Sequence, residues 1–182
     1  MSPTPDGVVV ATTRGFVSVG RGGEEGPLRV GVGIPDFSWA IGSTDDLGVL
    51  VEAVAAWRER MPLDELRQRF EFLELDEFTD ALERGEPTAS QWSGLLSSDF
   101  HRGQWDLLRR IHADEVLRTF FPTISHGAVR LRVDPLDGAS RQVLVAEVVS
   151  ERYDVMQSGT KEAIWVEVPS DALITHLRAA LK

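Results

Sequence analysis

The chain has 182 residues, 42% of them hydrophobic, which is enough to build one sizeable core, so a single domain is the expected arrangement. Nineteen basic residues against 29 acidic ones give a net charge of −10, which argues against a protein that binds the phosphate backbone of DNA or RNA. The chain contains no cysteine, which excludes disulfides, thiolate nucleophiles and cysteine-ligated metal sites.

The N-terminal residues lack the basic stretch and apolar run of a secretion signal, and no apolar run approaches the ~20 residues that span a bilayer. We therefore expect a soluble, cytoplasmic protein with no membrane association. The glycine-rich stretch RGGEEGP lacks the order of a phosphate-binding loop and carries two acids, so we read it as a hairpin loop and expect no cofactor.

The first half of the chain predicts strands followed by helices. Residues 1–6 hold two prolines and are expected to be disordered, while the β-branched residues of 7–41 predict two to four antiparallel strands. From residue 47 the apolar spacing becomes helical, with Ser43 and Thr44 as candidate N-caps and Pro62 as the stop. Two shorter helices are expected next, the second over 76–84 with Phe78 and Leu82 facing inward.

The second half predicts helices followed by strands. Ser90 is a candidate cap for a helix that carries Trp92, and the helical pattern resumes after Gly103 and ends near Pro122. From residue 127 alternating patterns predict four strands, the first with Arg130 and Arg132 pointing outward, and a final amphipathic helix begins near residue 170.

This order of elements predicts an α+β fold. We expect the N-terminal and C-terminal strands to form one antiparallel sheet, accompanied by a central helical segment and a C-terminal helix. The expected domain organisation is a disordered stretch over 1–6 and a single α+β domain over 7–182.

His126 is the one histidine that we expect in a turn, between Ser125 and Gly127. A rigid scaffold often presents functional side chains at such positions, so His126, Ser125 and Arg118 are the candidate catalytic residues. A general base would also need an orienting carboxylate, for which three aspartates nearby in sequence are candidates: Asp99, Asp106 and Asp114. The alternative is a structural turn that fixes a corner between helix and strand.

Other catalytic arrangements are disfavoured by spacing. The four histidines show no HxxxH or HExxH pattern, so no metal site is predicted. The sequence also lacks the GxSxG motif, whose sharp turn exposes a nucleophilic serine. A catalytic role therefore stays open only for the turn around His126.

Residues 71–86 concentrate charge, with seven acids and one arginine. Asp76, Asp80 and Glu83 are spaced by four and then three residues, which places them along one side of the predicted helix. This side is either a solvated face that keeps the protein soluble or a docking surface for a cationic protein partner.

Five tryptophans are many for this length. Three of them lie on apolar helix stripes and two lie in predicted strands, so most are expected in the core, although one or two could line a pocket.

The segment between Trp39 and Val133 resembles an actinobacterial family of unknown function that is usually labelled a natural product biosynthesis protein. The matching pieces are WAIGSTDDL before a helix that ends in AAW, EFLELDEF, a QW followed by LL, and LRTFFPTISHGAVRL. The resemblance implies a genomic setting in specialised-metabolite clusters, and it implies no catalytic residue.

These observations favour a non-enzymatic accessory protein that acts through protein contacts, using either the acidic helical face or an exposed sheet edge. One alternative is a small-molecule-binding protein or enzyme with a pocket at the turn of residues 125–127. Another is an immunity protein that binds a basic toxin. The sequence leaves the oligomeric state open.

Overall fold

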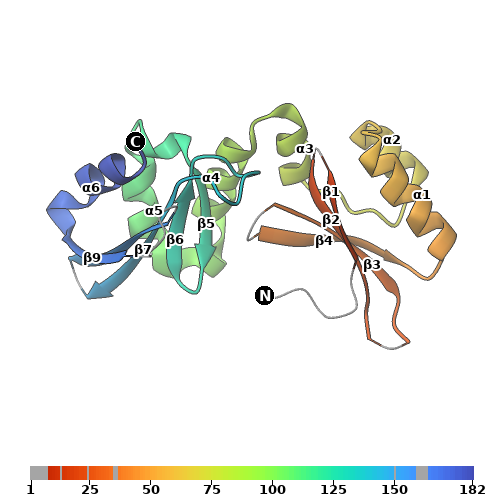
Figure 1. The fold of residues 1–182 in the computed structure, drawn as a ribbon, viewed down its shortest axis with the longest axis horizontal. Coiled ribbons are helices and arrows are strands. Elements are labelled where there is room, and N and C mark those ends of the chain that lie inside the picture. Colours follow the sequence, from red (N-terminus) through yellow and green to blue (C-terminus); the bar gives the residue numbers. More distant parts are fainter. Residues whose placement is uncertain (1–7, 13, 24, 35–36, 150, 159–163) are drawn as a thin grey trace. The chain divides into compact units, whose positions relative to one another are not determined.

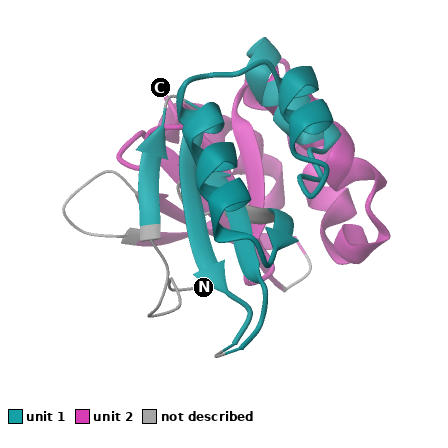
Figure 2. Cartoon of the chain, turned by 90° about the vertical axis from the view of Figure 1, so that its right-hand side faces the viewer, with its two compact units in different colours: residues 1–85 teal, residues 86–182 magenta. Residues whose placement is uncertain are grey.

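The computed structural model describes residues 8–12, 14–23, 25–34, 37–149, 151–158 and 164–182, so the prediction for residues 1–6 lies outside the described part. The chain divides into two compact units, residues 1–85 and residues 86–182 (Figure 2). Each unit contains one antiparallel sheet and several helices (Figure 1), which confirms the α+β class. The expected single α+β domain over residues 7–182 stays a prediction.

The strands form two sheets, whereas the sequence analysis expected one. The first has the order β1-β2-β3-β4 and the second the order β5-β6-β7-β8-β9. In both, every strand pairs only with its neighbours along the chain, because short hairpin connections favour pairing between consecutive strands. The helices of residues 47–112 separate the two groups along the chain.

Unit 1 begins with the four-stranded sheet. Its strands are β1 (Val8–Thr12), β2 (Gly15–Arg21), β3 (Leu28–Ile34) and β4 (Phe37–Thr44). The glycine-rich stretch forms the β2–β3 hairpin loop, as expected, and the backbone N–H of Gly22 donates to Pro27 O at 2.9 Å. A Cβ at Gly26 would lie 1.9 Å from Gly22 O, so this loop requires glycine there.

Three helices follow the first sheet: α1 (Leu47–Arg58), α2 (Leu63–Arg69) and α3 (Glu77–Arg84). The N-cap of α1 is Asp46, whose side chain accepts from Val49 N at 3.1 Å, and Ser43 and Thr44 instead end strand β4. The residues of α3 that are buried are Thr79 and Ala81, while Phe78 and Leu82 are only half-buried. The predicted caps of α1 therefore lie three and two residues before the actual cap, and the two residues predicted to face inward in α3 are each one position from a buried residue.

The core of unit 1 lies between its sheet and α1 and α2. Alternate strand residues such as Val17, Val30 and Val32 face this core, and α1 contributes Leu50 and Trp57. All members of this apolar cluster belong to residues 17–73, so the first sheet and its helices share a core of their own.

Unit 2 begins with helices and ends with a helix. Its helical elements are α4 (Pro87–Ser97), the 3-10 segment Asp99–Gln104, α5 (Trp105–His112), the 3-10 turns Leu117–Thr119 and Ser170–Ala172, and α6 (Leu173–Ala180). Helix α4 starts at Pro87, a favoured first helical residue, rather than after Ser90.

The second sheet has one strand more than predicted. It consists of β5 (Phe121–Ser125), β6 (Ala128–Arg132), β7 (Gln142–Val149), β8 (Arg152–Ser158) and β9 (Ile164–Pro169). Strand β5 was missed because Pro122 was taken as the end of a helix. Proline is tolerated in β5 because β5 is an edge strand.

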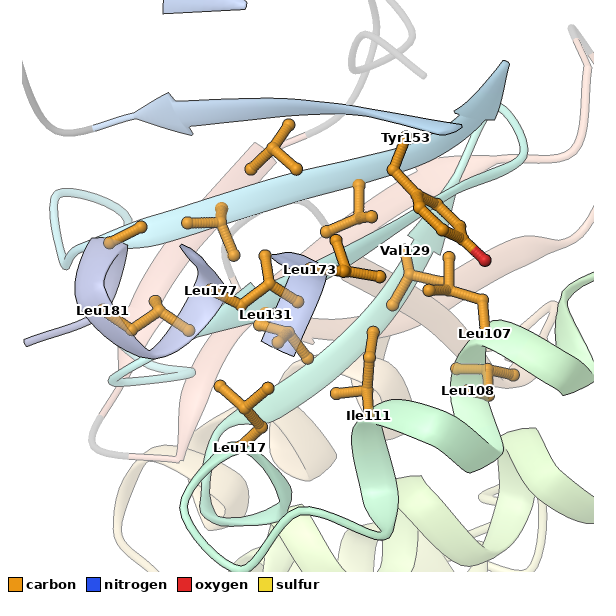
Figure 3. Close-up of a cluster of buried hydrophobic side chains, with 14 of the residues drawn as sticks. Leu107, Leu108, Ile111, Leu117, Val129, Leu131, Tyr153, Leu173, Leu177 and Leu181 are labelled. Carbon is orange, nitrogen blue, oxygen red and sulfur yellow. The ribbon is translucent and has the colours of Figure 1, made fainter. Parts of the chain in front are cut away.

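The core of unit 2 lies between one face of the second sheet and the helices (Figure 3). Val129 and Leu131 from β6 meet Ile111 from α5 and Leu177 from α6. Trp92 is 2% exposed, and its indole N–H donates to the carbonyl of Phe120 at 3.2 Å. The helices therefore cover this face of the sheet; the opposite face is called here the outer face.

The outward orientation predicted for Arg130 and Arg132 was only partly right. Both side chains lie on the outer face, away from the apolar cluster, yet Arg132 is only 2% exposed. Its guanidinium donates to the side-chain oxygen of Gln142, the residue opposite it on β7, at 3.0 Å.

Within the described residues, every helix is too short or too polar to cross a lipid bilayer.

Candidate functional site

The turn that holds His126 joins two strands. Ser125 and Ala128 are paired across the β5–β6 hairpin, and His126 and Gly127 form its two-residue loop with φ values of 51° and 81°. Positive φ at both loop residues is the signature of a type I′ turn, which matches the twist of the paired strands. The expected corner between helix and strand is therefore a β-hairpin.

The turn brings together two of the three candidate catalytic residues. Ser125 Oγ lies 3.0 Å from His126 Nδ1, and His126 is exposed to solvent. Arg118, in the 3-10 turn that precedes β5, is exposed, and its guanidinium makes no hydrogen bond or ion pair with another described residue. Ser125 and His126 thus form a contact, while Arg118 stays apart from it.

The aspartates considered as orienting groups are engaged elsewhere. Asp99 pairs with Arg102 at 2.7 Å, Asp106 lies 3.9 Å from Arg109, and Asp114 is held by Arg178. A serine–histidine pair can move a proton, but the described contacts supply no carboxylate to orient this imidazole. Catalysis by the pair stays a prediction.

The acids of the predicted docking face take part in contacts within unit 1. Asp76 is the N-cap of α3, where one of its oxygens accepts from Thr79 N at 2.9 Å and Thr79 Oγ1 at 2.8 Å. Both oxygens of Asp80 accept from Arg67, at 2.8 and 2.9 Å, and this carboxylate raises the pKa of the Arg67 guanidinium. These two acids serve the local structure of α3 and its link to α2.

Glu83 binds a buried arginine. Arg14, in the β1–β2 turn, is 5% exposed, and its Nη2 donates to Glu83 Oε1 at 2.9 Å. The other terminal nitrogen donates to the carbonyl of Met61 at 2.9 Å, and the guanidinium lies 5.5 Å from the ring centroid of Trp57. The cationic groups that match Asp80 and Glu83 are thus arginines of the same unit, a match that sequence spacing could not reveal.

Unit 1 also contains a small apolar cavity. Trp57 and Val30 line it together with other core residues of the sheet and α1. Its volume of about 10 Å³ is close to the space that one water molecule needs, so it is too small for an organic ligand. Within the described part of the chain, no three acids or histidines gather closely enough to hold a metal ion.

The outer face of the second sheet carries an exposed tryptophan. Trp165 is 51% exposed on β9, which lies at the edge of the sheet and, among the described strands, pairs with β8 alone. Across the sheet Trp165 is opposite Met156, and Met156 is opposite Leu144, so these three side chains form an apolar row. Sequence reasoning expected most of the five tryptophans in the core and did not single out Trp165. The alternation of Trp165 and Glu167 along the strand indicates that the two side chains share one face of the sheet.

Charged residues flank this row. On the same face Asp154 is directly opposite Glu167, two carboxylates in one cross-strand pair. Arg152 binds Glu167, and among the described residues Asp154 has no ion-pair partner. We give the name β8–β9 outer surface to six residues of β8 and β9 on this face: Arg152, Asp154, Met156, Trp165, Glu167 and Pro169.

Comparisons with protein-family models, with curated proteins and with solved structures find no match to this chain. The resemblance noted for residues 39–133 therefore stays a prediction.

Proposed function

We propose that the chain is a non-catalytic accessory protein that binds another protein through the β8–β9 outer surface and the free edge of β9. The setting in specialised metabolism is part of this proposal and rests on the resemblance alone. Of the two surfaces considered from the sequence, the sheet edge is favoured over the acidic helix, because Asp80 and Glu83 already bind arginines of unit 1.

The observation that carries the proposal is the exposure of Trp165. A tryptophan that is 51% exposed leaves a large apolar surface in water, and tryptophan is among the residues most enriched in binding hot spots. Val166, its neighbour on the opposite face of β9, is 43% exposed, so both faces of this strand offer apolar contacts.

The edge itself adds a second kind of contact. A strand that is paired on one side only presents backbone N–H and C=O groups along its other side, and extended segments of partner proteins bind such edges by adding a strand. Natural edges are usually protected by charged side chains, proline, a bulge or a covering helix or loop. Strand β9 carries one charged side chain, Glu167, and one proline at its last position, Pro169, and its pairing with β8 shows no bulge.

Site-specific photo-crosslinking tests the proposal. Benzoylphenylalanine is placed at Trp165, and in a control chain at Leu136, which is also apolar and similarly exposed, at 47%. Both chains are expressed in the native host and irradiated.

The proposal predicts that position 165 forms an adduct with one defined protein and that position 136 does not. Identical adducts at both positions, or none at position 165, would refute it.

A further inference from the structure

We infer that the partner segment that adds to β9 carries an apolar residue and an arginine two positions apart. This inference rests on the proposed function and specifies the chemistry of the partner. It follows from the side chains that β9 presents on the outer surface, which are apolar at Trp165 and acidic at Glu167.

Strand geometry sets the spacing. Trp165 and Glu167 are two residues apart, so both point to the same face of the sheet. A strand that pairs with β9 would lie roughly 4.8 Å away, and its residues opposite Trp165 and Glu167 would also be two apart on that face. The partner residue opposite Trp165 would therefore contact its indole ring, and the partner residue opposite Glu167 would contact its carboxylate.

Charge favours a basic residue opposite Glu167, because Arg152 binds Glu167 and leaves Asp154, directly across from it, with no ion-pair partner among the described residues. The β8–β9 outer surface holds two carboxylates, Asp154 and Glu167, and a single guanidinium, that of Arg152. Like charges directly opposite each other across a sheet are destabilising, and a cation from the partner would offset this repulsion. An acidic partner residue would add a third carboxylate to the same place.

Arginine fits this position better than lysine. Its planar guanidinium can bind a carboxylate through two parallel hydrogen bonds and can also stack on an aromatic face, and Glu167 and Trp165 offer these two groups side by side on β9. The apolar residue of the partner would then cover the exposed indole.

Short peptides supply the test. The first probe is dye-labelled Thr-Leu-Thr-Arg-Thr-Leu-Thr with blocked ends, which contains the leucine–arginine spacing in both directions. Matched probes replace its arginine with glutamate, or replace the two flanking threonines with proline to prevent strand pairing. Binding to the full chain is followed by fluorescence anisotropy at low and high salt.

The arginine peptide is expected to bind at least about tenfold more tightly than the glutamate peptide and to weaken as salt rises. The proline peptide should not bind.

The double variant Asp154→Asn/Glu167→Gln should bind the arginine peptide at least about fivefold more weakly than the wild-type chain does. The control Glu74→Gln/Glu77→Gln, which removes two exposed acids of unit 1, should leave binding unchanged. Circular dichroism of each variant establishes that it is folded.

Two outcomes would overturn the inference while leaving the proposed function intact. In the first, the arginine and glutamate peptides bind equally well and Trp165→Ala abolishes both. In the second, no peptide binds although position 165 captures a defined protein in the crosslinking experiment. Failure of that crosslinking experiment would instead remove the proposed function, and the partner chemistry with it.

Discussion

The guanidinium of Arg14 and the carboxylate of Glu83 form an ion pair across 69 positions of the sequence, with Arg14 Nη2 and Glu83 Oε1 2.9 Å apart. Arg14 is 5% exposed, whereas the side chain of Glu83 is 32% exposed. The pair links the β1–β2 turn to helix α3 and removes one acid from the predicted docking face.

Removal of Glu83 is expected to destabilise the protein more than removal of both partners. Glu83→Ala leaves a cation buried without its carboxylate, and breaking such a pair costs roughly 3–5 kcal/mol when both groups are deeply buried. Because Glu83 is partly solvated, we expect about 2 kcal/mol. Urea unfolding of Glu83→Ala, Arg14→Met and the double variant measures the coupling; Glu77→Ala on the same helix is the control. Equal losses in Glu83→Ala and Glu77→Ala would contradict the role of the pair.

Asp114 should make stability depend on pH at acidic values. Arg178 Nε donates to Asp114 Oδ1 at 3.0 Å, and the backbone N–H of Leu117 donates to the same oxygen at 3.0 Å. The hydrogen bond from Arg178, followed by those from Leu117 and Val116, lowers the pKa of Asp114. A lowered folded-state pKa means that the stabilisation is complete above the unfolded-state pKa, roughly 3.9, and is lost as pH falls through the folded value.

The test compares the wild-type chain with Asp114→Asn by thermal unfolding between neutral and acidic pH. The wild type should be more stable by about 1–3 kcal/mol at neutral pH, and this difference should shrink below about pH 4. A difference that stays constant down to the acid limit would show that the charge of Asp114 contributes nothing.

Replacement of His126 with asparagine should preserve or raise stability. His126 has a φ of 51° in the first position of a type I′ turn, where asparagine followed by glycine is the preferred pair. We expect His126→Asn to add up to about 1 kcal/mol to the free energy of unfolding. The matched variant His126→Val should destabilise, because a β-branched residue strains this conformation. A loss of stability in His126→Asn as large as in His126→Val would contradict the turn assignment.

Two tryptophans of unit 2 should respond in opposite ways to substitution. Trp92 is 2% exposed and hydrogen-bonded, so Trp92→Ala should cost roughly 3–5 kcal/mol. Trp165 is half-exposed, so Trp165→Ala should cost less than about 1 kcal/mol while removing partner binding. Denaturant unfolding of both variants measures the difference; a large loss from Trp165→Ala would mean that its ring packs in the fold.

Local patterns were sufficient to predict most elements of the fold. The apolar spacing of α1, the position of α3 along the chain and the alternation within β7 and β8 all depend on nearby residues, and the structure contains each of them. The division into two sheets depends on which strands pair, and alternation within a single strand carries no information on its neighbours.

The candidate site was harder to predict because its decisive contacts are distant in sequence. Spacing placed Asp80 and Glu83 on one helix side, but their partners Arg67 and Arg14 lie 13 and 69 residues away. The expectation that most tryptophans lie in the core did not separate the exposed Trp165 from the buried Trp92. The alternation of Trp165 and Glu167 is a local signal that this face of the strand is exposed to solvent, and it predicts the position of Trp165 better than the hydrophobicity of tryptophan does.

Amide hydrogen exchange of β9 tests the central claim most directly. The outward-facing amides of an unpaired edge should exchange rapidly in the isolated chain, because no neighbouring strand accepts their hydrogen bonds. On addition of the protein captured at position 165, or of the arginine peptide, the amides of β9 should become protected while those of the β5 edge stay unchanged. Protection that appears elsewhere and leaves β9 unchanged would contradict the assignment of β9 as the binding edge.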